Sequence, residues 1–441
     1  MPNGTMQRSS LVKDTLIYSL GAFLIKAFGF FLIPVYTRFL TVEEYGVLAL
    51  LSIILQFVSF VLLLGVSSAA MRFYFDGLSD ADYQRRVYGN ALIILLIFPG
   101  LLLAFALPIG KSLAPRFLPS IPFFPYIFVI FLIGLCNPIQ RLVLGLMRVR
   151  RQAVQYIAYS VSLFLLQTGA IILAVVWWKA GIRGIVYAQL AANAVFWGIG
   201  VAIVGRYAKF SFSTDIAKRL LYFGLPLIPF FIFIWINDAS GRFMLERYSN
   251  LRDLGIFALA LQFSHMLGFL SRALENSMLP FFYETAQLPK ASEVLGNFAT
   301  NYFVLFGLAA LFTLVVAQPL VLIAADTKFH EATTYIPIII LAGWLEIVFN
   351  IFYWNLMHSK RTQLISALLG ASAVLMVGML FLLLKTLGLG IRGAVLAMVV
   401  IALLKDVAGY FLSQHYFKLK YSLPKIVMSS FLLVIAGLII Y

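Results

Sequence analysis

The stretch 364–384 reads LISALLGASAVLMVGMLFLLL and contains no charged residue. As a helix, about 20 such residues cross the hydrocarbon core of a bilayer. Comparable stretches recur along the whole chain, which is 62% hydrophobic and 11% charged, against about 25% charged residues in a soluble domain. A transmembrane barrel needs short segments that alternate apolar and polar residues, whereas these stretches are apolar on all sides. The sequence therefore predicts an all-α polytopic membrane protein.

Twelve apolar segments are predicted to span, and a thirteenth, 426–441, is either a short final span or half of a hairpin. The first segment is too long for a signal peptide and is expected to remain as a helix. Lysine and arginine concentrate on the side of the membrane that holds the N-terminus in this arrangement, which predicts a cytoplasmic N-terminus. The predicted spans are 14–37, 46–66, 88–108, 122–147, 153–177, 184–205, 217–237, 254–274, 300–325, 335–357, 364–386 and 391–413.

The motifs on either side of the stretch 364–384 also occur earlier in the chain. GIRGAVLA at 390–397 matches GIRGIVYA at 181–188, an offset of 209, and LMHSKR at 356–361 matches LMRVRR at 146–151, an offset of 210. A third match relates the segments around Gly46 and Gly255, again at 209. Glycine and arginine recur at helix ends in many membrane proteins, but a nearly constant offset indicates an internal duplication.

Each copy of the duplication contains six predicted spans, so both copies enter the membrane with the same orientation. Paired bundles related by an axis along the membrane normal are a transporter architecture, in which substrate binds between the bundles and access alternates by rocking. We predict one six-helix bundle at 1–208, a second at 209–416, and an additional hydrophobic segment at 417–441.

Two N-terminal segments resemble a known family. PVYTRFLTVEEYG at 34–46 and GVSSAAMRFY at 65–74, with the motifs above and the layout of six plus six spans, resemble the polysaccharide repeat-unit flippases, also called O-antigen or Wzx-type flippases. These belong to the multidrug, oligosaccharidyl-lipid and polysaccharide exporter superfamily, and the resemblance covers essentially the whole chain.

The resemblance implies a transported substrate and a location. The substrate would be a polyprenyl-pyrophosphate-linked oligosaccharide, moved from the cytoplasmic to the outer leaflet of a bacterial inner membrane for cell-surface polysaccharide such as the O-antigen of lipopolysaccharide. It also implies a working monomer, surrounded by membrane lipids, that associates with polysaccharide polymerase and chain-length proteins.

Lys26 lies near the middle of the first predicted span. A charge at the centre of a span costs about 2.5–3.5 kcal/mol on insertion scales, so it suggests a function. We expect its ammonium to capture the pyrophosphate as a point charge, unless the side chain snorkels to the interface. By resemblance, Lys26 matches a cavity arginine on the first helix of lipid II flippases. A second cavity arginine of that family falls near Gln262 here, which disfavours lipid II as substrate.

Glu346, Asn350 and Trp354 are spaced to share one face of the tenth predicted span. We predict that this stripe lines the substrate cavity. Glu346 would take up a coupling proton or pair with Lys26. The alternative is a structural ion pair between helices.

Other polar residues are also placed in or beside spans. Gln262 and His265 share a face of the eighth span, where His265 either donates to a sugar or is a hydrogen-bonded core residue. Arg72 and Arg141 are expected at cytoplasmic span ends, as contacts for incoming pyrophosphate or as topological anchors. Asp238 is expected to end the seventh span, in solvent.

Enzymatic chemistry is not expected. We find no nucleophile and base pair, metal-ligand cluster or glycine-rich phosphate loop, and Cys136 alone builds neither a disulfide nor a thiolate site. The net charge of +16 is dispersed between spans, which disfavours nucleic acid as a partner. No cofactor is expected, although transport would be coupled to H⁺ or Na⁺. The alternatives are a multidrug exporter, a lipid II flippase or, less favoured, a membrane polysaccharide polymerase or ligase.

Overall fold

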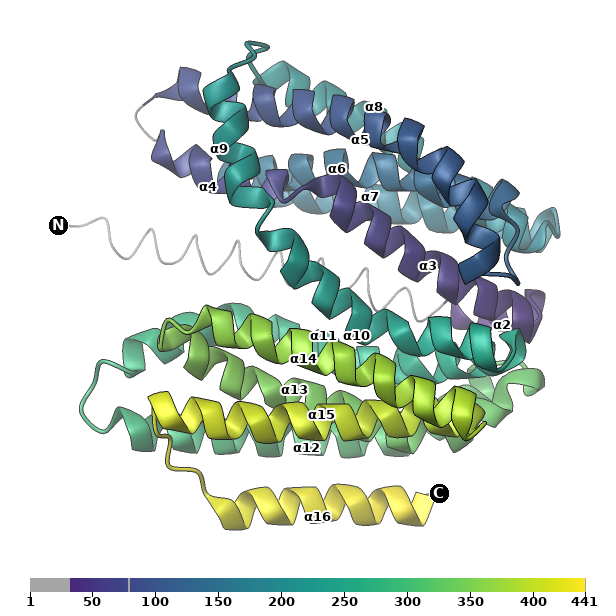
Figure 1. Ribbon diagram of the computed structural model, residues 1–441, viewed down its shortest axis with the longest axis vertical. Coiled ribbons are helices and arrows are strands. Elements are labelled where there is room, and N and C mark those ends of the chain that lie inside the picture. Colours follow the sequence, from purple (N-terminus) through teal and green to yellow (C-terminus); the bar gives the residue numbers. More distant parts are fainter. Residues whose placement is uncertain (1–31, 78–79, 441) are drawn as a thin grey trace. The chain divides into compact units, whose positions relative to one another are not determined.

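The computed structural model describes residues 32–77 and 80–440, and within these ranges the regular structure is helical, without strands (Figure 1). Eleven helical segments of the described chain are long and apolar enough to cross a membrane. They correspond one to one with the eleven predicted spans from 46–66 to 391–413. The all-α polytopic fold is therefore confirmed, whereas residues 14–31 of the predicted span 14–37 lie outside the described residues.

The helices form two compact units. The N-terminal unit comprises the described residues up to Leu40 and from Leu50 to Trp235, and the C-terminal unit comprises Thr41–Ala49 and the residues from Ile236 onward. The bundle boundaries at 208 and 416 stay predictions. The helices from α2 to α10 are α2 (Ile33–Phe39), α3 (Val42–Leu63), α4 (Val66–Asp76), α5 (Ala81–Phe117), η1 (Phe123–Ile127), α6 (Phe128–Val149), α7 (Ala153–Ile172), η2 (Leu173–Trp177), α8 (Gly181–Tyr207), α9 (Thr214–Gly224) and α10 (Leu227–Tyr248). The remaining helices are α11 (Leu251–Thr285), α12 (Ala291–Ala324), η3 (Thr327–Thr334), α13 (Ile336–His358), α14 (Thr362–Leu380), η4 (Phe381–Thr386), α15 (Gly390–Tyr416) and α16 (Leu423–Ile440).

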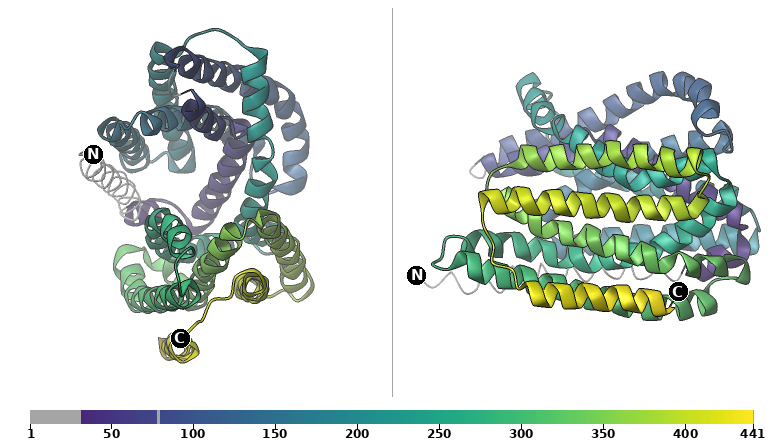
Figure 2. Two further views of the ribbon diagram at one scale, coloured as in Figure 1. Left: turned by 90° about the vertical axis from the view of Figure 1, so that its left-hand side faces the viewer. Right: turned by 60° about the horizontal axis from the view of Figure 1, so that its bottom comes forward.

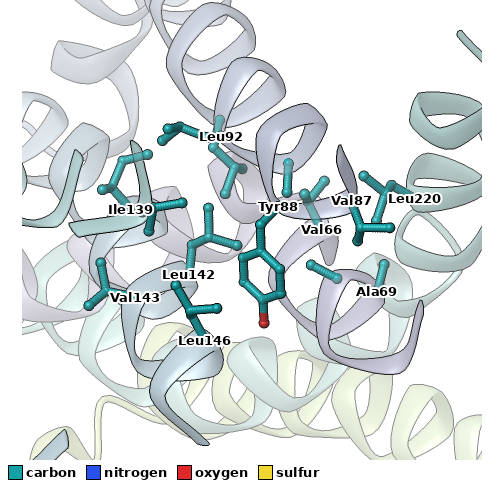
Figure 3. Packing of buried hydrophobic residues seen from close by; sticks show 14 of the residues in the cluster. Val66, Ala69, Val87, Tyr88, Leu92, Ile139, Leu142, Val143, Leu146 and Leu220 are labelled. Carbon is teal, nitrogen blue, oxygen red and sulfur yellow. The ribbon is translucent and has the colours of Figure 1, made fainter. Parts of the chain in front are cut away.

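The core of the N-terminal unit is packed around Tyr88 of α5. Its fully buried ring lies among Val66 of α4 and Leu142 and Leu146 of α6 (Figure 3). Small residues such as Ala69 let α4 approach, since close packing between helices, rather than exclusion of water, holds helices together in lipid. This packing fixes α6 against α4 and α5.

The internal duplication is also visible in the backbone. Arg151 and Lys360, at equivalent positions after α6 and α13, have left-handed φ values of 55° and 57°. The amide after each one donates five residues back, from Gln152 to the Met147 carbonyl at 2.8 Å and from Arg361 to the Leu356 carbonyl at 3.0 Å. This is the Schellman way to end a helix. These hydrogen bonds show that Met147 is the structural counterpart of Leu356. The offset between the two copies is therefore 209 here too, rather than the 210 that the sequence motifs alone indicate.

The GIRG motif begins α8 and α15. Its first glycine has φ of 54° at Gly181 and 53° at Gly390, a conformation that costs glycine little because it has no Cβ. Each of these helices follows a π-helical segment, η2 before α8 and η4 before α15. After each segment a backbone amide donates to the carbonyl six residues back: Ala180 N to Ala174 O and Leu389 N to Leu383 O, each at 3.0 Å. The repeated GIRG motif thus corresponds to the same turn between helices in both halves of the chain.

A second pair of glycines brings the central helices of each unit together. A Cβ built on Gly200 of α8 would lie 3.1 Å from Ile139 and Val143 of α6, and one built on Gly409 of α15 would lie 3.1 Å from the Phe352 ring of α13. The two glycines are again 209 positions apart. The pairs α6/α8 and α13/α15 are the most extensive helix contacts of their units.

Replacing Gly409 with valine should therefore destabilise the protein by about 1–3 kcal/mol, the usual range for overpacking. Gly378→Val is the matched control, because a Cβ on Gly378 has no heavy atom within 4 Å. Scanning fluorimetry of the purified variants measures the difference. Equal melting temperatures for the two would show that α13 and α15 separate without strain.

The two units differ at the ends of the equivalent helices α3 and α11. In the N-terminal unit α3 ends at Leu63, and Gly65, with φ of 65°, starts α4. Gly65 packs there against the backbone of Gly224 at the end of α9. In the C-terminal unit α11 continues without a break to Thr285.

The seventh predicted span is bent and longer than expected. α9 ends at Gly224, and α10 runs on from Leu227 to Tyr248, so Pro226 lies at the bend. Asp238 therefore lies inside α10, and its expected place at the end of a span is wrong.

The thirteenth hydrophobic segment forms α16. It packs against α12 and α13 and lies beside α12 (Figures 1 and 2).

Candidate functional site

A polar pocket of about 480 Å³ lies in the N-terminal unit, between α3 and α6. At membrane depth such groups are expensive unless they are paired or line a functional cavity. The polar residues that line it are Ser52, Gln56, Ser59, Asn137, Gln140 and Arg141.

Hydrogen bonds to neighbouring helices hold the amide side chains of this pocket. Asn137 Nδ2 donates to Ser59 Oγ of α3 at 2.7 Å, and Gln140 Nε2 donates to Asn193 Oδ1 of α8 at 2.9 Å. Because both bonds join helices, the wall that presents Arg141 is positioned by the fold.

Arg141 is the cation of this pocket. It lies about two turns before α6 ends at Val149, rather than at the helix end where the sequence places it. In the part of the chain that the structure describes, no carboxylate lies within ion-pair distance of its guanidinium, which is exposed toward the pocket. The wall of this pocket therefore carries a cation that has no acidic partner among the described residues.

The duplication relates this pocket to the residues predicted in the second half. At the offset of 209, Gln56 corresponds to His265, Asn137 to Glu346, and Arg141 to Asn350. Both halves thus carry polar side chains at the same places on equivalent helices, α3 and α6 in one unit and α11 and α13 in the other. The side-chain chemistry differs between the halves: the cation Arg141 corresponds to the neutral Asn350, and the amide of Asn137 corresponds to the carboxylate of Glu346.

Glu346 is held by a residue that was not predicted. Lys405 Nζ of α15 lies 2.5 Å from Glu346 Oε2 and 4.8 Å from the centre of the Phe349 ring. The Lys405 side chain is 4% exposed, while that of Glu346 is 51% exposed. The carboxylate therefore reaches the surface of the unit, and the ammonium is buried behind it.

Asn350 and Trp354, which follow Glu346 on α13, contact other helices than Glu346 does. Asn350 Nδ2 donates to Ser271 Oγ of α11 at 3.0 Å. Trp354 is only 2% exposed and packs against the Tyr302 ring of α12 at 5.1 Å between ring centres. Trp354 belongs to the packed interior, so its predicted place in a cavity wall is wrong.

Gln262 and His265 lie on α11 and are half-buried. His265 Nε2 is 3.9 Å from Asp238 Oδ1, and the same carboxylate is 3.5 Å from the guanidinium of Arg242. Gln262 hydrogen-bonds the side chain of Tyr45. These side chains therefore take part in a polar network within the C-terminal unit.

Arg72 and Lys26 are not placed in these clusters. Arg72 lies on α4 with its side chain 57% exposed and pairs with Asp76 one turn later. Lys26 lies outside the described residues.

The sequence is similar to a family of known proteins and to two proteins of Haemophilus influenzae. The family model described as "Polysaccharide biosynthesis protein" matches residues 35–334, about two thirds of the chain. The chain is similar to the Lsg locus putative protein 1 of Haemophilus influenzae, with 22% identity over 80% of this chain and 86% of that protein. It is likewise similar to an uncharacterized membrane protein of the same organism, with 23% identity over 81% of this chain and 86% of that one.

Solved structures with the same fold are transporters. An inward-facing multidrug resistance MATE family transporter of the MOP superfamily superposes with a TM-score of 0.64 and 15% identity, covering 88% of this chain and 94% of that one. A MOP superfamily transporter from Pyrococcus furiosus, whose binding pocket is described as having reverse polarity, gives a TM-score of 0.60 at 16% identity, covering 92% and 95%. The chain is thus a multi-pass membrane protein that shares its fold with these structures, and it belongs to the polysaccharide biosynthesis protein family.

Proposed function

We propose that the protein is a flippase that moves a polyprenyl-pyrophosphate-linked oligosaccharide repeat unit from the cytoplasmic to the outer leaflet. The observation that carries the proposal is Arg141, a cation in a polar pocket without an acidic partner among the described residues. A guanidinium binds the oxygens of a phosphate through two parallel hydrogen bonds. The amides of Gln56 and Gln140 beside it are of the kind that bind sugar hydroxyl groups.

Several features of the proposed cycle rest on the sequence. We place the protein in the bacterial inner membrane with a cytoplasmic N-terminus, working as a monomer in contact with polysaccharide polymerase and chain-length proteins. Lys26 adds a second positive charge to the pyrophosphate site. Movement of H⁺ or Na⁺ down its gradient drives the alternation of access.

Depletion of the protein in its native cells tests this proposal. The lipid-linked repeat unit should accumulate in the cytoplasmic leaflet and surface polysaccharide should disappear, while susceptibility to cationic drugs stays unchanged. Complementation by the plasmid-borne gene serves as the control. Unchanged surface polysaccharide together with increased drug susceptibility would instead identify a multidrug exporter.

A further inference from the structure

A second pocket, of about 610 Å³, lies in the C-terminal unit between α12, α13, α15 and α16. Its wall is mostly apolar, and Asp406 of α15 is the one charged residue among the described residues that line it. Six aromatic residues contribute to the wall: Phe303, Trp344, Phe352, Tyr410, Phe411 and Tyr421.

Polar atoms from three helices or their ends are buried in this wall without a hydrogen-bond partner in the described chain. They are both carboxylate oxygens of Asp406, the indole nitrogen of Trp344 and the hydroxyl of Tyr421. Asp406 is only 8% exposed. Buried polar groups almost always have a partner, and each exception calls for an explanation. Three such groups around one pocket point to a ligand that supplies the missing partners.

The charges near the pocket are unbalanced. Lys405, the residue before Asp406 on α15, is paired with Glu346, and consecutive residues of a helix do not face each other. Among the described residues, no cation forms an ion pair with the Asp406 carboxylate, and neither of its oxygens accepts a hydrogen bond. Aromatic rings around a carboxylate are the environment in which proteins bind ammonium groups.

The mouth of the pocket opens among residues that face the bilayer. Leu403, Val407 and Phe411 line the pocket and are 45%, 52% and 67% exposed. Val427 and Phe431 of the neighbouring α16 are similarly exposed apolar residues. On a membrane protein such a surface is covered by acyl chains, so an occupant enters this pocket from the bilayer.

We propose that this pocket binds an aminophospholipid of the surrounding membrane. Its ammonium group contacts Asp406, its ester and phosphate oxygens accept from Trp344 and Tyr421, and an acyl chain follows the apolar wall. The bound lipid would hold α16 against α12, α13 and α15. This site lies in the other unit from the pocket of Arg141, so it is independent of the proposed transport function.

Lipid binding to the purified, delipidated full-length protein tests the proposal. Native mass spectrometry and thermal unfolding are followed during titration with phosphatidylethanolamine or, for comparison, phosphatidylglycerol, which lacks the ammonium group. We expect phosphatidylethanolamine to bind and raise the melting temperature of the wild type, and phosphatidylglycerol to bind at least about tenfold more weakly, since a charge-assisted contact is lost.

Two variants and one control sharpen the test. Asp406→Asn should weaken phosphatidylethanolamine binding at least about tenfold, yet be no less stable without lipid, because the carboxyl group that it removes is buried without a hydrogen-bond partner among the described residues. Leu403→Trp should block the mouth and abolish the lipid-dependent rise without touching a charge. Glu331→Gln, at an exposed ion pair with Arg252, should behave as the wild type.

Three outcomes would overturn the proposal. One is equal binding of the two lipids to the wild type. Another is full phosphatidylethanolamine binding by Leu403→Trp, and this outcome would overturn the proposal even if Asp406→Asn fails to fold. The third is stabilisation by dodecylamine but not by phosphatidylethanolamine. That result would identify the ligand as a soluble cationic amphiphile rather than a bilayer lipid.

Discussion

Arg141→Gln should reduce polysaccharide export by about ten- to a hundredfold, because a charge-assisted hydrogen bond contributes about 1.5–3 kcal/mol. The cation stands in a pocket whose amide groups are held by other helices, and glutamine keeps much of the side-chain volume without the charge. Arg141→Lys should retain part of the activity, since an ammonium supplies charge but not the planar fork.

Arg72→Gln is the matched control for this experiment. Arg72 is also a candidate cation, but its side chain is exposed and paired with Asp76, so we expect export near the wild-type level. The measurement compares surface polysaccharide and accumulated lipid-linked repeat unit at equal membrane levels of each variant. If Arg72→Gln blocks export and Arg141→Gln does not, the pocket between α3 and α6 is not the site of the pyrophosphate.

Glu346→Ala should lower the stability by about 3 kcal/mol, because it removes the partner of a buried ammonium group. The substitution leaves Lys405, whose side chain is 4% exposed, without its carboxylate. Lys405→Met should be much milder, because the Glu346 that remains is 51% exposed and can be solvated. The effect is therefore expected to be asymmetric.

The double variant Glu346→Ala/Lys405→Met completes the cycle. It should be nearly as stable as Lys405→Met alone, because it contains no buried unpaired ammonium. Thermal unfolding in detergent compares the four proteins. Equal losses for the two single variants would contradict the burial difference, and export assays in parallel show whether Glu346 has a transport role beyond this pair.

Much of the fold is predictable because lipid imposes long apolar segments. Each of the eleven spans in the described chain was expected, and the repeated GIRG motif indicated the corner that precedes α8 and α15. Helix ends were less predictable. α5 runs from Ala81 to Phe117, beyond the apolar span 88–108, because its ends continue where polar residues are tolerated.

The candidate sites were less predictable, since they depend on which face of a helix meets a neighbour. Trp354 follows Glu346 by eight residues, which turns it about 80° away around the helix, and the structure buries it. Lys405 and Asp406 are two charged residues inside the predicted span 391–413, so the sequence carries the same signal there as at Lys26. The pairing of Lys405 with Glu346 required tertiary structure.

The helix ends at Arg151 and Lys360 bear on how the chain is made. Both residues are basic, and both hold a left-handed backbone conformation that glycine adopts at less cost. Positive charges in short loops help to orient a nascent membrane protein as its segments emerge from the ribosome, before any tertiary contact exists. At these two loops a basic residue stands where glycine would cost the backbone less, and under the topology proposed above its charge would help to keep the loop on the cytoplasmic side during synthesis.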